Sequence, residues 1–225
     1  NLAKALEVAL NDGADPITGG KAVDSAPLAT GSGFDDLWDR YCGIVERRVE
    51  ALARHQKLEY EVTASHAPLL FASLLSSDCL GREKCLLEGG TTHLGGTLET
   101  YGNANAADSL HAINELVFKR RACSLEELRD ALRRNFDGSE DLEAELKAIG
   151  KYGNDDGGAD AMMQRVHDHV CHHARNCAAA AGLDSFLVVN INNWANTVLG
   201  WKTGAGADGR RAGEPLANGN NPSPG

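Results

Sequence analysis

A dense run of glycine and proline near the end of the sequence constrains the fold most. Residues 208–216 read DGRRAGEPL, and residues 221–225 read NPSPG. Glycine and proline recur there too often for a helix or a central strand, so we predict a loop. The run follows the best strand candidate, within residues 183–193, and it holds charged side chains in a glycine-rich turn. Loops on a rigid scaffold commonly carry function, so a functional site is first sought here.

The overall composition predicts one globular segment covering residues 1–225. Hydrophobic residues make up 42% of the chain and charged residues 24%, as in ordinary globular proteins. A net charge of -10 disfavours a nucleic-acid partner, which needs clustered Lys and Arg. The sequence contains no apolar run of membrane-spanning length and no secretory signal pattern. Six cysteines form no C-x-x-C pair, which predicts reduced thiols and a cytoplasmic location. Because the sequence starts at Asn1 and stops inside a loop, we expect a segment open at both ends.

The hydrophobic pattern predicts many helices and few strands, as part of an α/β layout. Apolar residues at helical spacing, together with capping residues, predict helices over residues 2–10, 34–61, 69–75, 109–119, 124–134, 140–149 and 160–181. Asp108 is expected to cap the fourth of these, and Ser124 with Glu127 to form a capping box for the fifth. Residues 183–193 are expected to form a buried strand.

The end of that strand carries the candidate site. Asn190, Asn192, Asn193 and Trp194 follow the apolar run directly. In barrels and open α/β sheets, residues at the carboxyl ends of strands face the ligand. These four residues are therefore our candidates for a substrate pocket, although Asn and Trp could equally satisfy a strand end.

A metal site is the main alternative within the helical part. His169, His173 and Cys177 share one face of the expected helix at ligand spacing. A solvated histidine-rich face is the simpler interpretation, so we predict no metal there.

Two further groups have a chemical and a structural interpretation. Cys79 could be a nucleophile near Arg82 and Lys84, but a buried small thiol is commoner. Asp155 and Asp156 could act as an acid–base pair, but adjacent carboxylates before a helix more often cap it. We expect the structural role in both cases.

Several passages, in order, resemble glycyl radical enzymes, the family of pyruvate formate-lyase and the B12-independent diol dehydratases. The glycine–proline run, with Thr203 and Gly204 ahead of it, resembles TG-x-x-x-DGR-x-AG-x-P…SPSxG. Residues 102–113, GNANAADSLHAI, resemble GvANvaDSLaAIk, and residues 152–155, YGND, resemble [YF]GND. Cys79 with the glycine pair at 89–90 resembles C-I-x-x-G…GGA. The likeness spans essentially all of the sequence.

The resemblance implies a fold and a chemistry. The fold implied is a helix-rich part of a ten-stranded α/β barrel, within its second half-barrel. In the family a glycyl radical generates a thiyl radical on a cysteine, which abstracts a substrate hydrogen. The radical is installed by an S-adenosylmethionine/iron–sulfur activase, and the whole enzyme is expected to be a homodimer in anaerobic metabolism. No dissociable cofactor is implied.

The resemblance also implies what this segment lacks. No R-V-x-G-[FY] glycyl loop is present, and Cys79 matches a family cysteine that does not form the thiyl. We therefore expect no catalytic residue and no activity from this segment alone. The whole protein would be a lyase, a dehydratase or a formate acetyltransferase-like transferase acting on a small polar metabolite. Ile191 stands where diol dehydratases have Tyr, which weakens a glycerol-type dehydration. A non-catalytic structural or partner-binding relative is the alternative, and a metal-binding helical domain is a weaker one.

Overall fold

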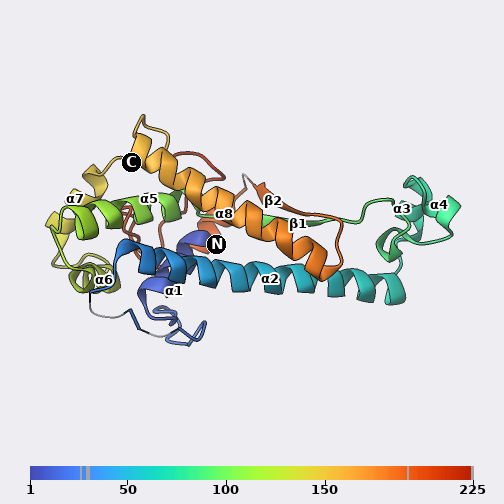
Figure 1. Ribbon diagram of the computed structural model, residues 1–225, viewed down its shortest axis with the longest axis horizontal. Coiled ribbons are helices and arrows are strands. Elements are labelled where there is room, and N and C mark those ends of the chain that lie inside the picture. Colours follow the sequence, from blue (N-terminus) through green and yellow to red (C-terminus); the bar gives the residue numbers. More distant parts are fainter. Residues whose placement is uncertain (26, 29–30, 192, 224–225) are drawn as a thin grey trace. The chain divides into compact units, whose positions relative to one another are not determined.

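A computed structural model of the chain describes residues 1–25, 27–28, 31–191 and 193–223 (Figure 1). Its helices and strands follow in the order α1 (Leu2–Leu10), α2 (Phe34–His66), α3 (Leu70–Leu75), α4 (Cys79–Arg82), the 3₁₀ turn η1 (Leu86–Glu88), β1 (Gly96–Thr100), α5 (Asn103–Ile113), the π-helical turn η2 (Asn114–Lys119), α6 (Leu125–Arg133), α7 (Glu140–Ala148), α8 (Gly157–Ala181), β2 (Phe186–Asn190) and α9 (Ala195–Trp201). The predicted excess of helices over strands is confirmed. None of the described helices combines the length and apolarity that a bilayer crossing requires.

The chain divides into two compact units. The first comprises Asn1–Val45, Thr100–His169 and Asn190–Gly225, and the second comprises Glu46–Glu99 and Val170–Val189. Both units therefore draw on segments far apart in the sequence.

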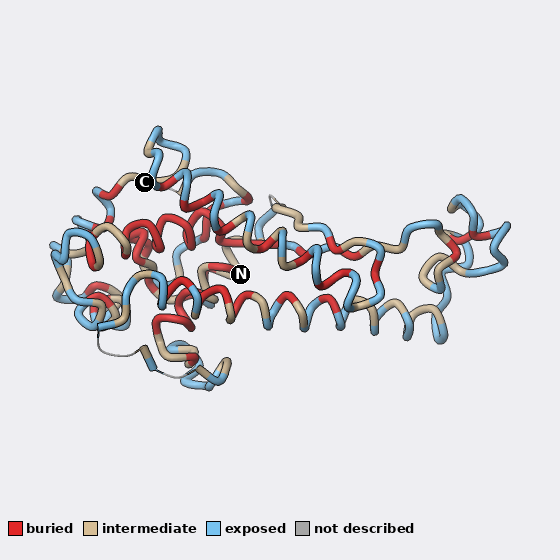
Figure 2. Tube along the Cα trace, in the orientation of Figure 1, coloured by how far each residue is buried: buried red, intermediate tan, exposed pale blue. Residues whose placement is uncertain are grey.

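The first unit is built around α5. Every residue of α5 is buried, and α1 packs against it (Figure 2). The prediction that Asp108 caps a helix starting at Ser109 is wrong, because α5 already begins at Asn103. Gly102, in the left-handed region at φ 68°, precedes α5, and Asp108 lies in mid-helix. The polar first turn, Asn103 to Asn105, concealed this start, because the two buried asparagine side chains bond to distant segments of the chain.

Other local predictions in the first unit are confirmed. Ser124 Oγ accepts the Glu127 N–H at 3.1 Å, and the Glu127 carboxylate accepts the Ser124 N–H at 2.7 Å. Asp156 caps α8 by accepting the N–H groups of Gly158 and Ala159, both at 2.9 Å. These motifs depend on neighbours in sequence, and so the sequence specifies them.

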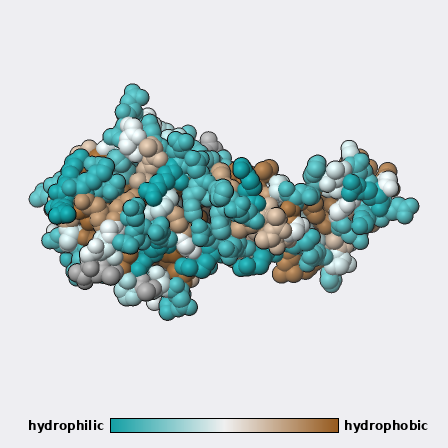
Figure 3. All heavy atoms as spheres, viewed as in Figure 1, coloured by the Kyte–Doolittle hydropathy of each residue, from teal (hydrophilic) through white to brown (hydrophobic). Residues whose placement is uncertain are grey.

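The second unit contains the later parts of α2 and α8 together with α3, α4 and η1. Its glycines allow close backbone approach: a Cβ on Gly90 would meet Lys84 O at 2.3 Å, and one on Gly95 would meet Ser185 Oγ at 2.2 Å. Leu52 on α2 is 50% exposed. Six exposed apolar side chains lie in and around α3, and Figure 3 shows apolar surface there. They are Leu69, Leu70, Phe71, Leu74, Leu75 and Leu80.

β1 and β2 pair as a two-stranded sheet. The Asp184 N–H donates to Leu94 O at 3.0 Å, and the Gly96 N–H donates to Ser185 O at 2.8 Å. The contacts advance in the same direction along both strands, so the strands are parallel and their carboxyl ends meet. The strand predicted over residues 183–193 is thus shorter, and it is only partly buried, since Leu187 is 60% exposed.

Candidate functional site

A cluster of carboxamides lies at the shared carboxyl end of β1 and β2, in the first unit. The Thr100 hydroxyl donates to Asn190 Oδ1 at 2.5 Å. Asn103, at the start of α5, donates from Nδ2 to the same oxygen at 2.5 Å and to Asn220 Oδ1 at 3.1 Å. Parallel pairing brings Thr100 and Asn190 to one edge, although 90 positions separate them in the sequence. We call Thr100, Asn103, Asn190 and Asn220 the strand-end cluster.

The other predicted site residues lie near the same edge or beyond it. Asn193 Nδ2 donates to the Tyr101 hydroxyl at 3.2 Å, and Asn193 Oδ1 accepts the Ala195 N–H at 2.8 Å, ahead of α9. The Trp194 side chain is exposed. Asn192 lies outside the described residues.

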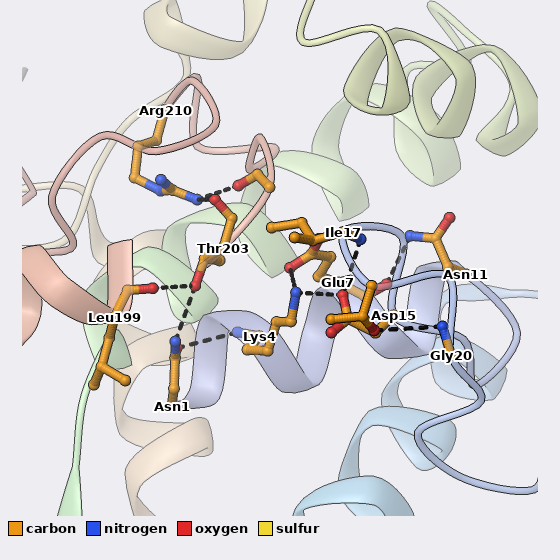
Figure 4. A network of polar contacts seen from close by, with 12 residues as sticks. Asn1, Lys4, Glu7, Asn11, Asp15, Ile17, Gly20, Leu199, Thr203 and Arg210 are labelled. Carbon is orange, nitrogen blue, oxygen red and sulfur yellow. Dashed lines mark hydrogen bonds and ion pairs between the residues drawn. The ribbon is translucent and has the colours of Figure 1, made fainter. Parts of the chain in front are cut away.

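The start of α1 lies beside this edge. The Leu2 N–H donates to Tyr101 O at 2.8 Å, and a Cβ on Gly102 would be 3.1 Å from Asn1 Oδ1. Asn1 Nδ2 also donates to Thr203 Oγ1 at 3.0 Å, and that hydroxyl donates to Leu199 O (Figure 4). A residue bonded ahead of Asn1 would therefore emerge next to Tyr101 and the strand-end cluster.

The predicted loop is confirmed over residues 208–216 and 221–223, whereas residues 224 and 225 lie outside the described residues; much of the first stretch is buried. Residues 203–216, the DGR loop, fold around the Arg210 guanidinium, which donates to the backbone oxygens of Thr203, Gly204, Arg211 and Glu214. Figure 4 shows Arg210 turned back onto the loop, above α1. Because these donors satisfy the loop's own carbonyls, Arg210 organises the loop from within.

Acidic and amide groups join the DGR loop to α5. Asn105 Nδ2 donates to Asp208 Oδ2 at 2.7 Å, and Asn105 Oδ1 accepts the Ala217 N–H at 2.7 Å. The neighbouring Asp108 accepts the Tyr152 N–H at 2.8 Å and the Ser223 hydroxyl at 3.0 Å. Burial, reinforced by the charge of Asp208, raises the pKa of Asp108 to about 6.

A two-point ion pair ties the loop to α7. Arg211 Nε and Nη2 lie 3.0 and 2.5 Å from the two carboxylate oxygens of Glu143. The Arg211 hydrogen bonds, supported by Lys147, lower the pKa of Glu143 to about 2.

The remaining sequence candidates lie elsewhere. Cys79 is buried in the second unit, as expected for a structural thiol. His169, His173 and Cys177 do lie on α8, and His173 Nε2 is 3.6 Å from Glu50 Oε1. Over the residues that the structure describes, no three His, Cys, Asp or Glu side chains form a group able to hold a metal ion.

Sequence reasoning missed Thr100, Tyr101, Asn103 and Asn220. One signal was present: Thr100 ends a short run, residues 96–100, in which apolar Leu98 lies between polar neighbours, and Tyr101 follows it directly. Glycines around that run masked it as a loop. Asn220 carried no signal, because only the folded loop brings it to Asn103.

Comparison with known proteins gives one consistent result. The family model described as Pyruvate formate lyase-like matches residues 1–193. The chain is 29% identical to (2S)-3-sulfopropanediol dehydratase from Klebsiella oxytoca, covering 97% of this chain and 27% of the relative. It is 25% identical to trans-4-hydroxy-L-proline dehydratase from Clostridioides difficile, covering 100% of this chain and 29% of the relative. The chain thus spans less than a third of these relatives.

Solved structures agree. A glycyl radical enzyme from Archaeoglobus fulgidus superposes with a TM-score of 0.92 and 29% identity, over 99% of this chain and 28% of that one. The glycerol-bound B12-independent glycerol dehydratase from Clostridium butyricum gives the same TM-score, identity and coverage. The predicted fold class, a helix-rich part of the α/β barrel of glycyl radical enzymes, is confirmed.

Proposed function

Since the chain belongs to the pyruvate formate lyase-like family, we propose that it forms part of the barrel wall of a glycyl radical enzyme. The whole protein would cleave or eliminate a bond in a small polar metabolite. A lyase or dehydratase reaction is favoured, because the curated relatives include two dehydratases and an isethionate sulfite-lyase from Bilophila wadsworthia. A formate acetyltransferase-like transfer is the less favoured form of the same chemistry.

One observation carries the proposal. The start of α1 is hydrogen-bonded to the carboxyl end of β1, through Leu2 N and Tyr101 O. Residues 1–4, NLAK, with residues 11–13, NDG, resemble the helix that follows the family's cysteine loop, so this loop would lie immediately ahead of α1. A cysteine loop joined to Asn1 would then enter beside the strand-end cluster, within reach of a substrate bound there. The carboxyl ends of parallel strands are also where ligands bind in α/β folds.

In this proposal the chain's own residues bind and orient the substrate. Asn190 and Asn193 offer amide groups at the strand edge, and the exposed Trp194 offers an apolar wall. Asn192 belongs to the same candidate pocket. Arg210 and Asp208 hold the DGR loop rather than the substrate, because their hydrogen bonds are made within the protein. The radical-bearing residues are expected outside this chain, so the segment alone would be inactive.

The full-length protein would act with partners. A glycyl radical, installed by an S-adenosylmethionine/iron–sulfur activase, would supply the hydrogen abstraction, and no dissociable cofactor is proposed. A homodimer in the cytoplasm is the expected form. The free state of all six cysteines suits a reducing compartment.

The test starts from the coding sequence on both sides of this segment. A cysteine loop ahead of Asn1 and an R-V-x-G-[FY] loop beyond Gly225 are expected. The extended protein would then be activated without oxygen and its glycyl radical measured by electron paramagnetic resonance. Asn190→Ala and Asn193→Ala should keep the radical signal and lose turnover at least tenfold, because they remove proposed substrate contacts and leave the radical-bearing loops unchanged.

Lys119→Ala is a matched control, since within the described part of the chain the exposed Lys119 bonds only to Glu115. It should keep both signal and turnover. Full turnover in both asparagine variants would refute the pocket assignment. An extended gene without the two loops would refute radical catalysis and favour the non-catalytic structural or partner-binding relative.

A further inference from the structure

We propose that Asn103 is a positioning residue that orients the carboxamides of Asn190 and Asn220, so that both present N–H donors to a ligand. The strand end would then bind the oxygens of a carboxylate or sulfonate group. That this ligand is the substrate rests on the proposed function, whereas the orientation of the amides does not.

The orientation follows from donor and acceptor chemistry. Asn103 Nδ2 carries only donors, and it faces Asn190 Oδ1 at 2.5 Å and Asn220 Oδ1 at 3.1 Å. The Thr100 hydroxyl adds a second donor to Asn190 Oδ1 at 2.5 Å. Turning the Asn190 amide alone would set NH₂ against NH₂ and lose the hydrogen bond from Asn103.

Reversing all three amides together is also disfavoured. Asn103 is 2% exposed, and its Oδ1 has no hydrogen-bond partner in the described part of the chain. A concerted reversal would put an NH₂ group with two donors at that buried position. Orphaned N–H groups are rarer in proteins than under-satisfied carbonyl oxygens. When the Asn190 and Asn220 oxygens face Asn103, the atom left unpaired is the Asn103 oxygen. This costs less free energy than an unpaired NH₂ group at the same buried position.

With both oxygens turned inward, both nitrogens remain available. Among the described residues, neither Asn190 Nδ2 nor Asn220 Nδ2 has a hydrogen-bond partner, and both side chains are half-buried. Asn193 is fixed in the same sense, because its oxygen accepts the Ala195 N–H and its nitrogen already donates to the Tyr101 hydroxyl. The strand-end cluster itself thus offers amide N–H donors from Asn190 and Asn220, and its four members are neutral side chains.

A surface of neutral donors selects for a ligand group that only accepts. Carboxylate and sulfonate oxygens accept hydrogen bonds in several directions. An ammonium group brings only donors and would find no acceptor among these amides. A hydroxyl can accept, but it leaves its own proton facing donors. Oxyacid groups therefore fit best.

The experiment is a nuclear magnetic resonance titration of the 225-residue chain labelled with ¹⁵N at its asparagine side chains. The probes are sodium acetate, sodium methanesulfonate, glycerol and methylammonium chloride at matched ionic strength. Loss of signals in Asn190→Asp and Asn220→Asp assigns the two NH₂ groups. In the wild type, both groups should shift saturably with acetate or methanesulfonate and not with glycerol or methylammonium.

Variants at Asn103 test the positioning role. Asn103→Asp keeps the shape and replaces the donor by an acceptor, so both amides should reverse. The oxyanion Kd should rise at least tenfold, and methylammonium should now shift the signals of Asn190. Asn103→Leu removes the donor without adding charge, so the preference should be lost but not reversed. The exposed Asn218→Asp is the matched charge control and should leave the titration unchanged.

Equal shifts with methylammonium in the wild type, no shift with either oxyanion, or an unchanged preference in both Asn103 variants would overturn the proposal. These outcomes are independent of radical formation. A failed titration with a positive radical signal in the extended protein would refute the donor assignment alone.

Discussion

Arg211 and Glu143 form a two-point ion pair between the DGR loop and α7, with Nε–Oε1 and Nη2–Oε2 distances of 3.0 and 2.5 Å. The Glu143 side chain is 8% exposed, whereas that of Arg211 is 43% exposed. The pair therefore lies at the edge of the core, where the hydrogen bonds from Arg211 favour the charged form of the Glu143 carboxylate.

Acid should weaken this attachment within a defined pH window. The pKa of Glu143 falls from 4.5 to about 2, chiefly through the Arg211 hydrogen bonds. Because the folded pKa is the lower one, the stabilisation is complete above about pH 4.5 and is lost as the pH falls toward 2. Glu143→Gln should lower Tm at pH 7 and lose most of its difference from the wild type near pH 2. A constant difference in Tm across that window would contradict the assignment.

Asp108 should titrate in a different window and with the opposite sign. Burial, followed by the charge of Asp208, raises its pKa from 3.8 to about 6, while Lys151 opposes the shift. A raised acid pKa means that the folded state holds the proton more tightly. Stability should therefore fall as the pH rises from about 4 to 6.

Asp108→Asn should remove this pH-dependent loss of stability, because the amide does not ionise. Its oxygen can accept the Tyr152 N–H, and its nitrogen can still bond to the Ser223 hydroxyl. Melting curves at pH 4, 5, 6 and 7.5 would measure it. The variant should be at least as stable as the wild type at pH 7.5 and should lack its decline between pH 4 and 6. A variant that declines in parallel with the wild type would show that another group titrates there.

The adjacent arginines of the DGR loop should differ sharply in their tolerance of lysine. Arg210 is 8% exposed and donates to four backbone oxygens of its own loop, an arrangement that a lysine cannot reproduce. Arg210→Lys should destabilise the first unit by about 2 to 4 kcal/mol. Arg211→Lys, the matched control, keeps one contact to Glu143 and should have a much smaller effect. Urea unfolding of both variants measures the difference, and equal losses would refute the internal role of Arg210.

The contrast between these arginines shows what sequence reasoning could reach. The DGR loop was predicted from its glycines and prolines, because turn chemistry is local. The burial of Arg210 was not, because its acceptors are carbonyls whose positions only the folded loop defines. The same limit applies to Asp108. Its residue type and its place before an apolar run predicted a helix cap, but in the structure it accepts hydrogen bonds from two distant segments.

In the candidate site, too, some residues were predictable from local sequence and others were not. Asn190 and Asn193 were predicted as pocket candidates, because they follow an apolar strand candidate and strand ends are common ligand sites. Their partners Thr100, Asn103 and Asn220 depend on the pairing of β1 with β2 and on the return of the final loop. No periodic pattern specifies which strand pairs with which, so that half of the site required coordinates.

The exposed apolar side chains in and around α3, here called the apolar tip, should promote self-association of the chain. Phe71 and Leu75, on α3, are 75% and 73% exposed, and they are accompanied by four more exposed leucines. Apolar surface gathered in one place promotes self-association, because burying it removes it from water. The isolated chain should therefore self-associate and bind a hydrophobic dye. The double variant Phe71→Ser/Leu75→Ser should reduce both effects and change the free energy of unfolding by less than about 1 kcal/mol.

Leu98→Ser is the matched control for this tip, because Leu98 in β1 of the same unit is 5% exposed. Burying a serine hydroxyl there and losing the leucine contacts should cost about 2 to 5 kcal/mol. Sedimentation velocity, dye binding and urea unfolding on the three proteins separate the two effects. If the double variant unfolds as readily as Leu98→Ser, then Phe71 and Leu75 support the fold of the chain itself. If it stays folded and becomes monomeric, the tip is a surface that another polypeptide segment can cover without changing what lies beneath.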